Sequence, residues 1–210
     1  MLGPSGCGKT TLLNLLAGFD SPTNGKVFIG GKEVTKPSSK HILVVQNYGL
    51  FPWKTVGRNI SFGLEFQNID EEETKERVKD YAELVGLGGV ENRMPAELSG
   101  GMKQRVAIAR ALSVHPDILF MDEPFGALDE MTRITLEREL LRIWKEKKIT
   151  IVFVTHNIES AITLADRIAI MTPSPGKIKR IIPVNIPRPR DIASHKFENI
   201  KKEILSEFQL

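Results

Sequence analysis

A run of eight residues near the start of the sequence has the types and spacing that bind phosphate. Gly3, Pro4, Ser5, Gly6, Cys7, Gly8, Lys9 and Thr10 match the pattern G-x-x-x-x-G-K-[ST]. Glycines let the backbone wrap closely round an anion, and N–H groups at the start of the following helix face it. We expect this loop, with Thr11, to bind nucleotide phosphates. Lys9 would supply positive charge to the β and γ phosphates, and Thr10 a hydroxyl ligand to Mg²⁺.

Two carboxylates follow an apolar run further along the chain. Ile118–Met121 reads as a buried strand, and Asp122 and Glu123 come directly after it. Ligands bind at the carboxyl ends of parallel strands, where two acids are costly unless they meet a cation or react. We expect Asp122 to hold Mg²⁺, directly or through water. Glu123 would orient and deprotonate an attacking water.

Polar residues also close two other predicted strands. His156 follows the run 150–155, and Gln46 ends the run that begins at Ile42. An imidazole at this edge is able to hydrogen-bond the γ-phosphate and the water, and an amide to contact Mg²⁺ or water. The positions therefore predict catalytic roles for both residues, and a metal contact for Gln46. The remaining histidines are interpreted as surface or packing residues: His41, His115 and His195.

The elements that must position these residues alternate in an α/β pattern. Asp70 and Glu73 fit a capping box at one helix start, and no strand pattern occurs from 52 to 113, which predicts a helical insertion. The prolines of 173–189 favour an edge strand or an extended arm. The predicted strands are 27–30, 42–46, 118–121, 150–155 and 167–171, and the predicted helices are 9–17, 70–85, 100–113, 131–147, 157–165 and 194–208.

Composition excludes several classes of protein. The chain has 210 residues, of which 41% are hydrophobic and 26% charged, as in an ordinary globular domain. Its single cysteine excludes a disulfide scaffold, and no apolar run approaches the roughly 20 residues of a membrane helix. The net charge of +3 arises from a dilute excess in 173–210. That excess predicts a solvated surface, or weak attraction to anionic lipid, and no nucleic-acid partner.

A further motif carries a family resemblance. Leu98-Ser99-Gly100-Gly101-Met102 resembles the LSGGQ-type signature of ABC ATPases, with methionine where that signature has glutamine. Ser99 is a good N-cap, and the glycines expose N–H groups at a helix start, which makes a second anion site. Gln46 matches the family's Q-loop, 126–129 its D-loop and His156 its switch histidine. The resemblance covers practically the whole chain.

The resemblance implies a fold and an assembly. The fold is an α/β P-loop NTPase with a mostly parallel central sheet and a helical subdomain at about 52–113, within one domain of residues 1–210 that ends in an arm and helix at about 173–210. Two copies would dimerise head to tail round ATP and Mg²⁺. One copy would contribute Lys9, Thr10, Asp122, Glu123 and His156 to each ATP, and the other Ser99 and Gly101. Gly100 and Asp129 are also expected to bind the nucleotide.

A narrower likeness suggests the transport class. Residues 47–56, 171–178 and 187–191 resemble the nitrate/sulfonate/taurine-type importers. This implies a peripheral ATPase at the cytoplasmic face of the membrane that powers import of a small anion or sulfonate-like solute. Its partners would be permease subunits and, indirectly, an extracytoplasmic solute-binding protein. Phe51 and Trp53 would relay motion to the permease, or else pack locally in a core.

Other interpretations stay open. A non-transport ABC ATPase of DNA repair or translation usually carries a coiled-coil insertion or tandem cassettes, and a P-loop kinase or GTPase lacks the Ser99 signature. A nucleotide-binding fragment with little turnover is a further alternative. Because the chemistry begins at Gly3, the resemblance leads us to expect that antiparallel strands, a full central strand and an adenine-stacking aromatic are missing ahead of it.

Overall fold

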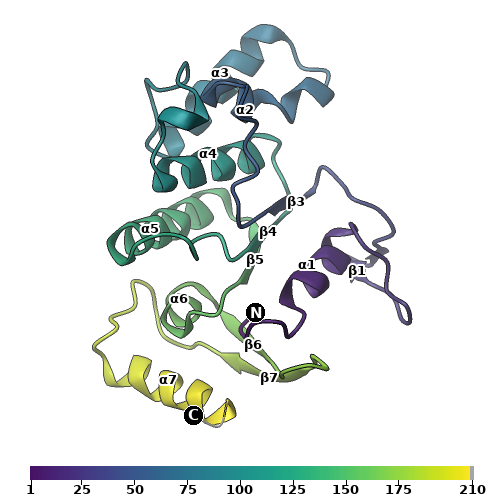
Figure 1. Ribbon diagram of the computed structural model, residues 1–210, viewed down its shortest axis with the longest axis vertical. Helices are drawn as coiled ribbons and strands as arrows, with labels where there is room; N and C mark the ends of the chain where they lie inside the picture. The colour runs from purple at the N-terminus through teal and green to yellow at the C-terminus, as the bar shows by residue number, and fades with distance from the viewer. Residues whose placement is uncertain (209–210) are drawn as a thin grey trace. The chain divides into compact units, whose positions relative to one another are not determined.

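The computed structural model describes residues 1–208, so the last two residues of the predicted domain, 209–210, lie outside the described part. The chain forms two compact units (Figure 1). The first consists of Met1–Lys36 together with the chain from Val152 onward, and the second of Pro37–Ile151. Within the described residues, no helix combines the length and apolar character that crossing a membrane requires.

In the first unit, Leu2 links two strand ends. It forms parallel bridges to Thr155 and to Ile170, so the residue just before the glycine-rich loop lies between them. The core of this unit gathers Leu2 with apolar residues of two helices and two strands, among them Ile162, Ile170 and Phe197. Its elements are α1 (Lys9–Ala17), β1 (Phe28–Ile29), β2 (Lys32–Glu33), α6 (Ile158–Leu164), β6 (Arg167–Met171), β7 (Ile178–Pro183) and α7 (His195–Glu207).

In the second unit, parallel strands carry a group of helices. The strand order is β3-β4-β5, and β3 pairs with β4 in parallel, with Val44 opposite Met121. Figure 1 shows α2, α3 and α4 grouped together above the strands. The elements are β3 (His41–Val44), α2 (Val56–Ser61), η1 (Leu64–Phe66), α3 (Glu71–Leu84), η2 (Pro95–Glu97), α4 (Gly100–Ser113), β4 (Ile118–Asp122), α5 (Glu130–Lys147) and β5 (Thr150–Val154), which continues into the first unit.

The predicted elements are confirmed at nearly every position, because local signals fix most helix ends. Asp70 accepts a hydrogen bond from the Glu73 N–H at 2.7 Å, as an N-cap does. In the predicted capping box, the Glu73 carboxylate would also accept from the Asp70 N–H. The Glu73 carboxylate instead pairs with Arg77 at 2.5 Å. Among the described residues between β3 and β4, every regular element is helical, as predicted.

The Pro-rich segment contains a strand. β7 pairs antiparallel with β6, with Ile182 opposite Ile168, and most of its side chains are exposed. Pro183 ends the strand, where its missing N–H costs no ladder bond. The edge-strand interpretation of this segment is therefore confirmed.

Candidate functional site

The glycine-rich loop connects Leu2 to the start of α1. Gly8 is the N-cap of α1 with φ 93°, and Gly6 has φ 75°, both in the left-handed region that glycine adopts without strain. No side chain caps this helix start. A helix start of this kind suits an anion, because its N–H groups point toward the loop and the helix dipole favours negative charge there.

Lys9 lies folded along this loop. Its ammonium donates to the carbonyl oxygens of Gly3 at 3.0 Å and Pro4 at 2.9 Å, and the residue is only 6% exposed. The positive charge is thus held inside the curve of the loop. Thr10 and Thr11 follow on the first turn of α1 and are exposed.

The glycine-rich loop packs closely against the end of β6 and the turn that follows it. A Cβ at Gly3 would lie 2.8 Å from the Cys7 sulfur and 3.1 Å from Cβ of Met171. A Cβ at Gly176, in the turn between β6 and β7, would overlap the Cys7 carbonyl oxygen and come within 3.0 Å of its carbon. Cys7 itself is buried. The β6–β7 turn therefore supports the loop backbone. No local sequence pattern predicts this contact, because the two segments are far apart in the sequence.

His156 follows a strand that pairs with the segment leading into this loop. Thr155 donates its N–H to the Met1 carbonyl oxygen at 3.1 Å and bridges to Leu2, so β5 and the strand end that enters the loop are neighbours. His156 follows directly and is exposed. The structure thus brings the histidine and the loop to the same edge of this unit.

The second unit brings together Gln46, Asp122 and Glu123. Because β3 and β4 are parallel and in register, the residues after Val44 and Met121 reach the same edge. A Cβ placed on Gly126 would lie 3.5 Å from Glu123 Oε2 and 3.7 Å from Gln46 Nε2, so both side chains lie beside that glycine. Glu123 has φ 44°, a strained conformation that is concentrated at functional sites.

The signature segment forms the start of α4. Ser99 Oγ accepts from the Met102 N–H at 3.3 Å, which confirms the predicted N-cap. A Cβ on Gly101 would come within 2.8 Å of Thr132 Cγ2, and one on Gly100 within 3.2 Å of Leu128. Close packing against α5 therefore leaves no room for a side chain at Gly101 without a shift, and Leu128 leaves little room at Gly100.

Asp129 has a structural role that its sequence position did not reveal. It caps α5 by accepting from the Thr132 N–H at 3.0 Å, and that hydrogen bonding lowers the pKa of its carboxyl group. The carboxylate is exposed at the helix start.

Sequence reasoning also missed two polar residues that hold the segment after Gln46. Arg110 of α4 donates to the carbonyl oxygens of Tyr48 at 3.1 Å and Gly49 at 2.7 Å. Asn59 of α2 is fully buried, accepts from the Phe51 N–H at 2.9 Å and donates to backbone carbonyls of the same turn. A single asparagine or arginine within a helix gives no local signal of such a contact.

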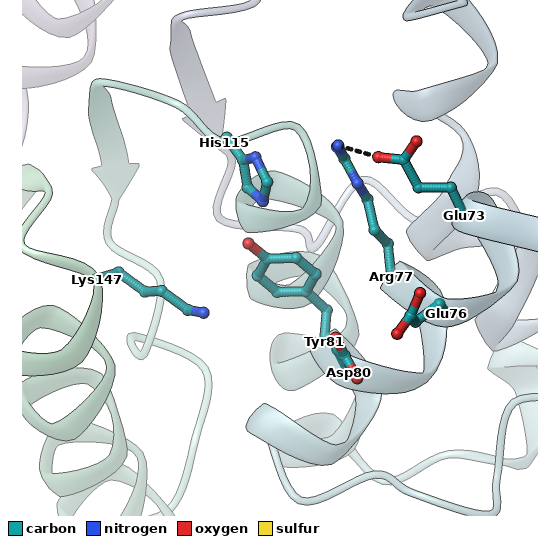
Figure 2. Close-up of a pocket in the computed structure, with 7 residues that line it drawn as sticks. All are labelled: Glu73, Glu76, Arg77, Asp80, Tyr81, His115 and Lys147. Atoms are coloured by element: carbon teal, nitrogen blue, oxygen red, sulfur yellow. Dashed lines mark hydrogen bonds and ion pairs between the residues drawn. The ribbon is translucent and has the colours of Figure 1, made fainter. Parts of the chain in front are cut away.

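A cavity of about 260 Å³ lies elsewhere in the second unit. Figure 2 shows His115 and Lys147 on one side of the Tyr81 ring, and Arg77, paired to Glu73, on the other. None of the predicted site residues line it. The lining residues are Glu73, Glu76, Arg77, Asp80, Tyr81, His115 and Lys147.

Comparison with known proteins identifies the family. The model of the ABC transporter family matches residues 1–126, a range that holds the glycine-rich loop, the Ser99 segment and the acidic strand end. The chain belongs to this family. It is an ATP-binding ATPase with the α/β P-loop fold predicted from the sequence.

Relatives match over nearly the full chain. An uncharacterised ABC transporter ATP-binding protein of Methanocaldococcus jannaschii is 50% identical over 98% of this chain and 77% of its own length. An aliphatic sulfonates import ATP-binding protein of Bacillus cereus is 48% identical over 100% and 82%. A bicarbonate transport ATP-binding protein of Synechococcus elongatus is 46% identical over 98% of this chain and 32% of its own.

Solved structures agree with this fold. The ATP-binding cassette MJ0796, described as a dimer in a post-hydrolysis state bound to ADP and Pi, superposes with a TM-score of 0.75 at 31% identity. The match covers 89% of this chain and 84% of that one. A second dimeric structure of the same cassette gives a TM-score of 0.76 at 33% identity, with the same coverage.

Proposed function

We propose that this chain is the ATP-hydrolysing subunit of a membrane importer for a small anionic solute of the sulfonate or bicarbonate kind. The supporting observation is the identity of 48% over 209 residues to an aliphatic sulfonates import ATP-binding protein. The subunit would act as a peripheral protein at the cytoplasmic face, bound to permease subunits. An extracytoplasmic solute-binding protein would act on it indirectly, through the permease.

Hydrolysis would use the glycine-rich loop together with the residues that follow β4 and β5. The N–H groups of the loop 3–10 and the ammonium of Lys9 bind the β and γ phosphates, so that charge developing on them is stabilised by groups already in place. Glu123 orients the attacking water and accepts its proton, and His156 hydrogen-bonds the γ-phosphate. Both residues stand at carboxyl ends of strands, where α/β folds bind ligands.

The oxygen donors available suit Mg²⁺. Thr10 is an exposed residue directly after Lys9, Gln46 lies two residues beyond the end of β3, and Asp122 ends β4, the parallel neighbour of β3. Hydroxyl, amide and carboxylate oxygens are the ligands that Mg²⁺ takes beside phosphate and water. We assign these three residues to the metal, which when bound neutralises phosphate charge.

A second copy would complete each site. The start of α4 presents Ser99, Gly100 and Gly101, a helix N-terminus suited to a phosphate, and Asp129 begins α5 beside it. The dimeric MJ0796 cassettes support assembly of two copies. In this arrangement, ATP held by Lys9 of one copy lies against Ser99 of the other.

The segment after Gln46 offers a surface for the permease. Trp53 is 71% exposed and Phe66 75% exposed, and Phe51 packs on Phe62 with ring centroids 4.5 Å apart. Phe51 is partly buried and contributes to local packing, whereas Trp53 is exposed at the surface. Contiguous exposed aromatics mark protein interaction sites, and Asn59 holds this turn in one conformation.

Replacement of the proposed base tests the hydrolytic mechanism. Glu123→Gln keeps the size and hydrogen-bonding capacity of the side chain but removes its basicity. We expect ATP binding to persist, a dimer to accumulate with ATP, and turnover to fall by about 10² or more. ATP affinity, size-exclusion chromatography and phosphate release measure these three effects.

The matched control is Glu72→Gln on the exposed first turn of α3, which should leave turnover unchanged. Undiminished phosphate release by Glu123→Gln would remove Glu123 from the mechanism.

Solute class is tested in the assembled transporter. The chain is co-purified with its membrane partners, reconstituted in vesicles, and its ATPase activity is measured with an alkanesulfonate or bicarbonate and the solute-binding protein. Stimulation by one of these anions supports the importer assignment. Failure to co-purify with any membrane protein would contradict it.

A further inference from the structure

Two arginines in the segment 187–191, here called the arginine arm, are not used by the proposed mechanism. The arm follows β7 and leads to α7. Arg190 directs its guanidinium at the end of α6 and at the segment that follows β7. It donates to carbonyl oxygens of five residues: Ile162, Thr163 at 3.3 Å, Ala165 at 2.7 Å, Val184 at 3.1 Å and Ile186 at 2.9 Å.

The arm accounts for the carbonyl groups that the end of α6 leaves without intrahelical partners. The last four carbonyls of any α-helix lack such partners. In α6, the Ala161 carbonyl accepts from the Ala165 N–H at 3.0 Å. Arg190 serves Ile162 and Thr163, and Arg188 serves Leu164 at 2.5 Å. The cationic guanidinium groups also complement the negative end of the helix dipole.

Such anchoring matters because α6 is short. It has seven residues, fewer than an isolated helix needs to be stable. Its start is fixed by Asn157, whose side chain accepts from the Ser160 N–H at 2.8 Å. Lys201 of α7 pairs with Glu159 at 2.8 Å on the first turn. The helix is thus held at both ends, and His156 is the residue that immediately precedes its N-cap.

We propose that Arg190, assisted by Arg188, is a positioning residue for His156. By anchoring the end of α6, the arm fixes the helix whose N-cap adjoins the imidazole, so the histidine keeps one position at the strand edge. This inference rests on the catalytic role proposed above for His156. It gives the arm a function in ATP turnover.

The charge state of the arm fits this role. Burial, together with the Arg188 guanidinium, lowers the pKa of Arg190 to about 10, so the group remains cationic at neutral pH and its N–H groups remain donors. The planar guanidinium offers five donors in a fixed fork, whereas lysine offers three on one atom. Arg190→Lys therefore keeps the charge and loses most of the anchoring.

The test measures ATP hydrolysis by the full chain carrying Arg190→Lys. We expect kcat to fall about tenfold while KM for ATP changes little, because the loop that binds phosphate is untouched and a small misplacement of a catalytic group is costly. Arg180→Lys is the matched control. Arg180 pairs with Glu203 and Glu207 of α7, and among the described residues it contacts no carbonyl of α6.

A double-mutant cycle separates positioning from general damage. In the His156→Ala background, Arg190→Lys should cause no further loss of kcat, because the group it positions is gone. An equal loss in both backgrounds would overturn the proposal. Undiminished hydrolysis by His156→Ala alone would instead contradict the proposed role of His156, so the two failures are distinguishable.

A spectroscopic readout does not depend on turnover. Histidine side-chain NMR of the full chain resolves its imidazoles, and Arg190→Lys should shift or broaden the His156 signal. The His115 signal, from the other unit, should stay in place. An unchanged His156 spectrum in a folded Arg190→Lys variant, with folding checked by circular dichroism, would also overturn the proposal.

Discussion

His115 stands where several positive charges meet at the edge of the cavity in Figure 2. Its ring lies 5.9 Å from that of Tyr81, and the Lys147 ammonium lies 5.2 Å from the Tyr81 centroid. Partial burial, together with Arg77, Lys147 and Lys40, lowers the pKa of His115, and Glu73 opposes this effect. Folding therefore disfavours the protonated imidazole relative to its state in the unfolded chain.

This residue predicts a pH dependence of stability with a definite sign. Below the unfolded pKa of about 6.5, the unfolded chain takes up a proton that folded His115 resists. The free energy of unfolding should therefore fall as pH decreases from about 6.5 toward the lowered pKa of the folded state. His115→Asn should weaken that fall. Asparagine is chosen because His115 has φ 53°, which asparagine tolerates well.

Urea unfolding at a series of pH values between about 7 and 5 measures this effect. Lys147→Met removes one of the nearby cations and should weaken the pH dependence in part. An identical pH dependence in the parent and in His115→Asn would show that the histidine does not contribute.

At the scale of elements, the β6–β7 turn is predicted to set the affinity for nucleotide. Gly176 does not have a left-handed φ, so alanine there meets no backbone strain of its own, only the Cys7 backbone of the loop. Overpacking of this kind costs about 1–3 kcal/mol. We expect Gly176→Ala to weaken ATP binding about tenfold, measured by calorimetry, because the loop must shift to admit the methyl group.

Gly88→Ala is the control for this substitution. Gly88 also lacks a left-handed φ, and its added Cβ would meet the flexible Glu83 side chain at 3.2 Å. ATP affinity should be unchanged in the control. If Gly176→Ala lowered stability but left ATP affinity intact, the turn would support the fold alone and not the loop.

Elements were predictable from the sequence where the signal is local. Ser99 and Asp70 cap the helices that they were expected to cap, and β-branched runs became β3 through β6. The alignment of Gln46 with Glu123 followed from the rule that parallel strands end at one edge.

Contacts between distant segments were not predictable, because no short pattern encodes them. Glu73 pairs with Arg77 instead of completing a capping box, since an ion pair one helical turn away competes for its carboxylate. The close approach of Gly176 to the Cys7 backbone and the hydrogen bonds of Arg190 to α6 join residues far apart in sequence. The left-handed backbone of Glu123 was likewise not predictable, because a glutamate rarely adopts a positive φ.

At the scale of the whole molecule, the proposed assembly makes a prediction that a single chain does not. If each ATP lies between the loop of one copy and the signature of the other, Lys9→Ala and Ser99→Ala each disable both sites of a symmetric dimer. Mixed dimers of the two variants would carry both defects at one site and none at the other. Mixing the variants should therefore restore ATP hydrolysis above the level of either alone.

The measurement is phosphate release from the two purified variants, separately and after mixing at several ratios. Activity should be greatest near equal amounts, where mixed dimers are most abundant. A mixture of Lys9→Ala with Glu123→Gln is the control, because both defects then belong to the same half of each site and every mixed dimer has two damaged sites. Recovery in the control, or none in the Ser99→Ala mixture, would contradict a site shared head to tail, since only a site built from two chains lets these defects segregate.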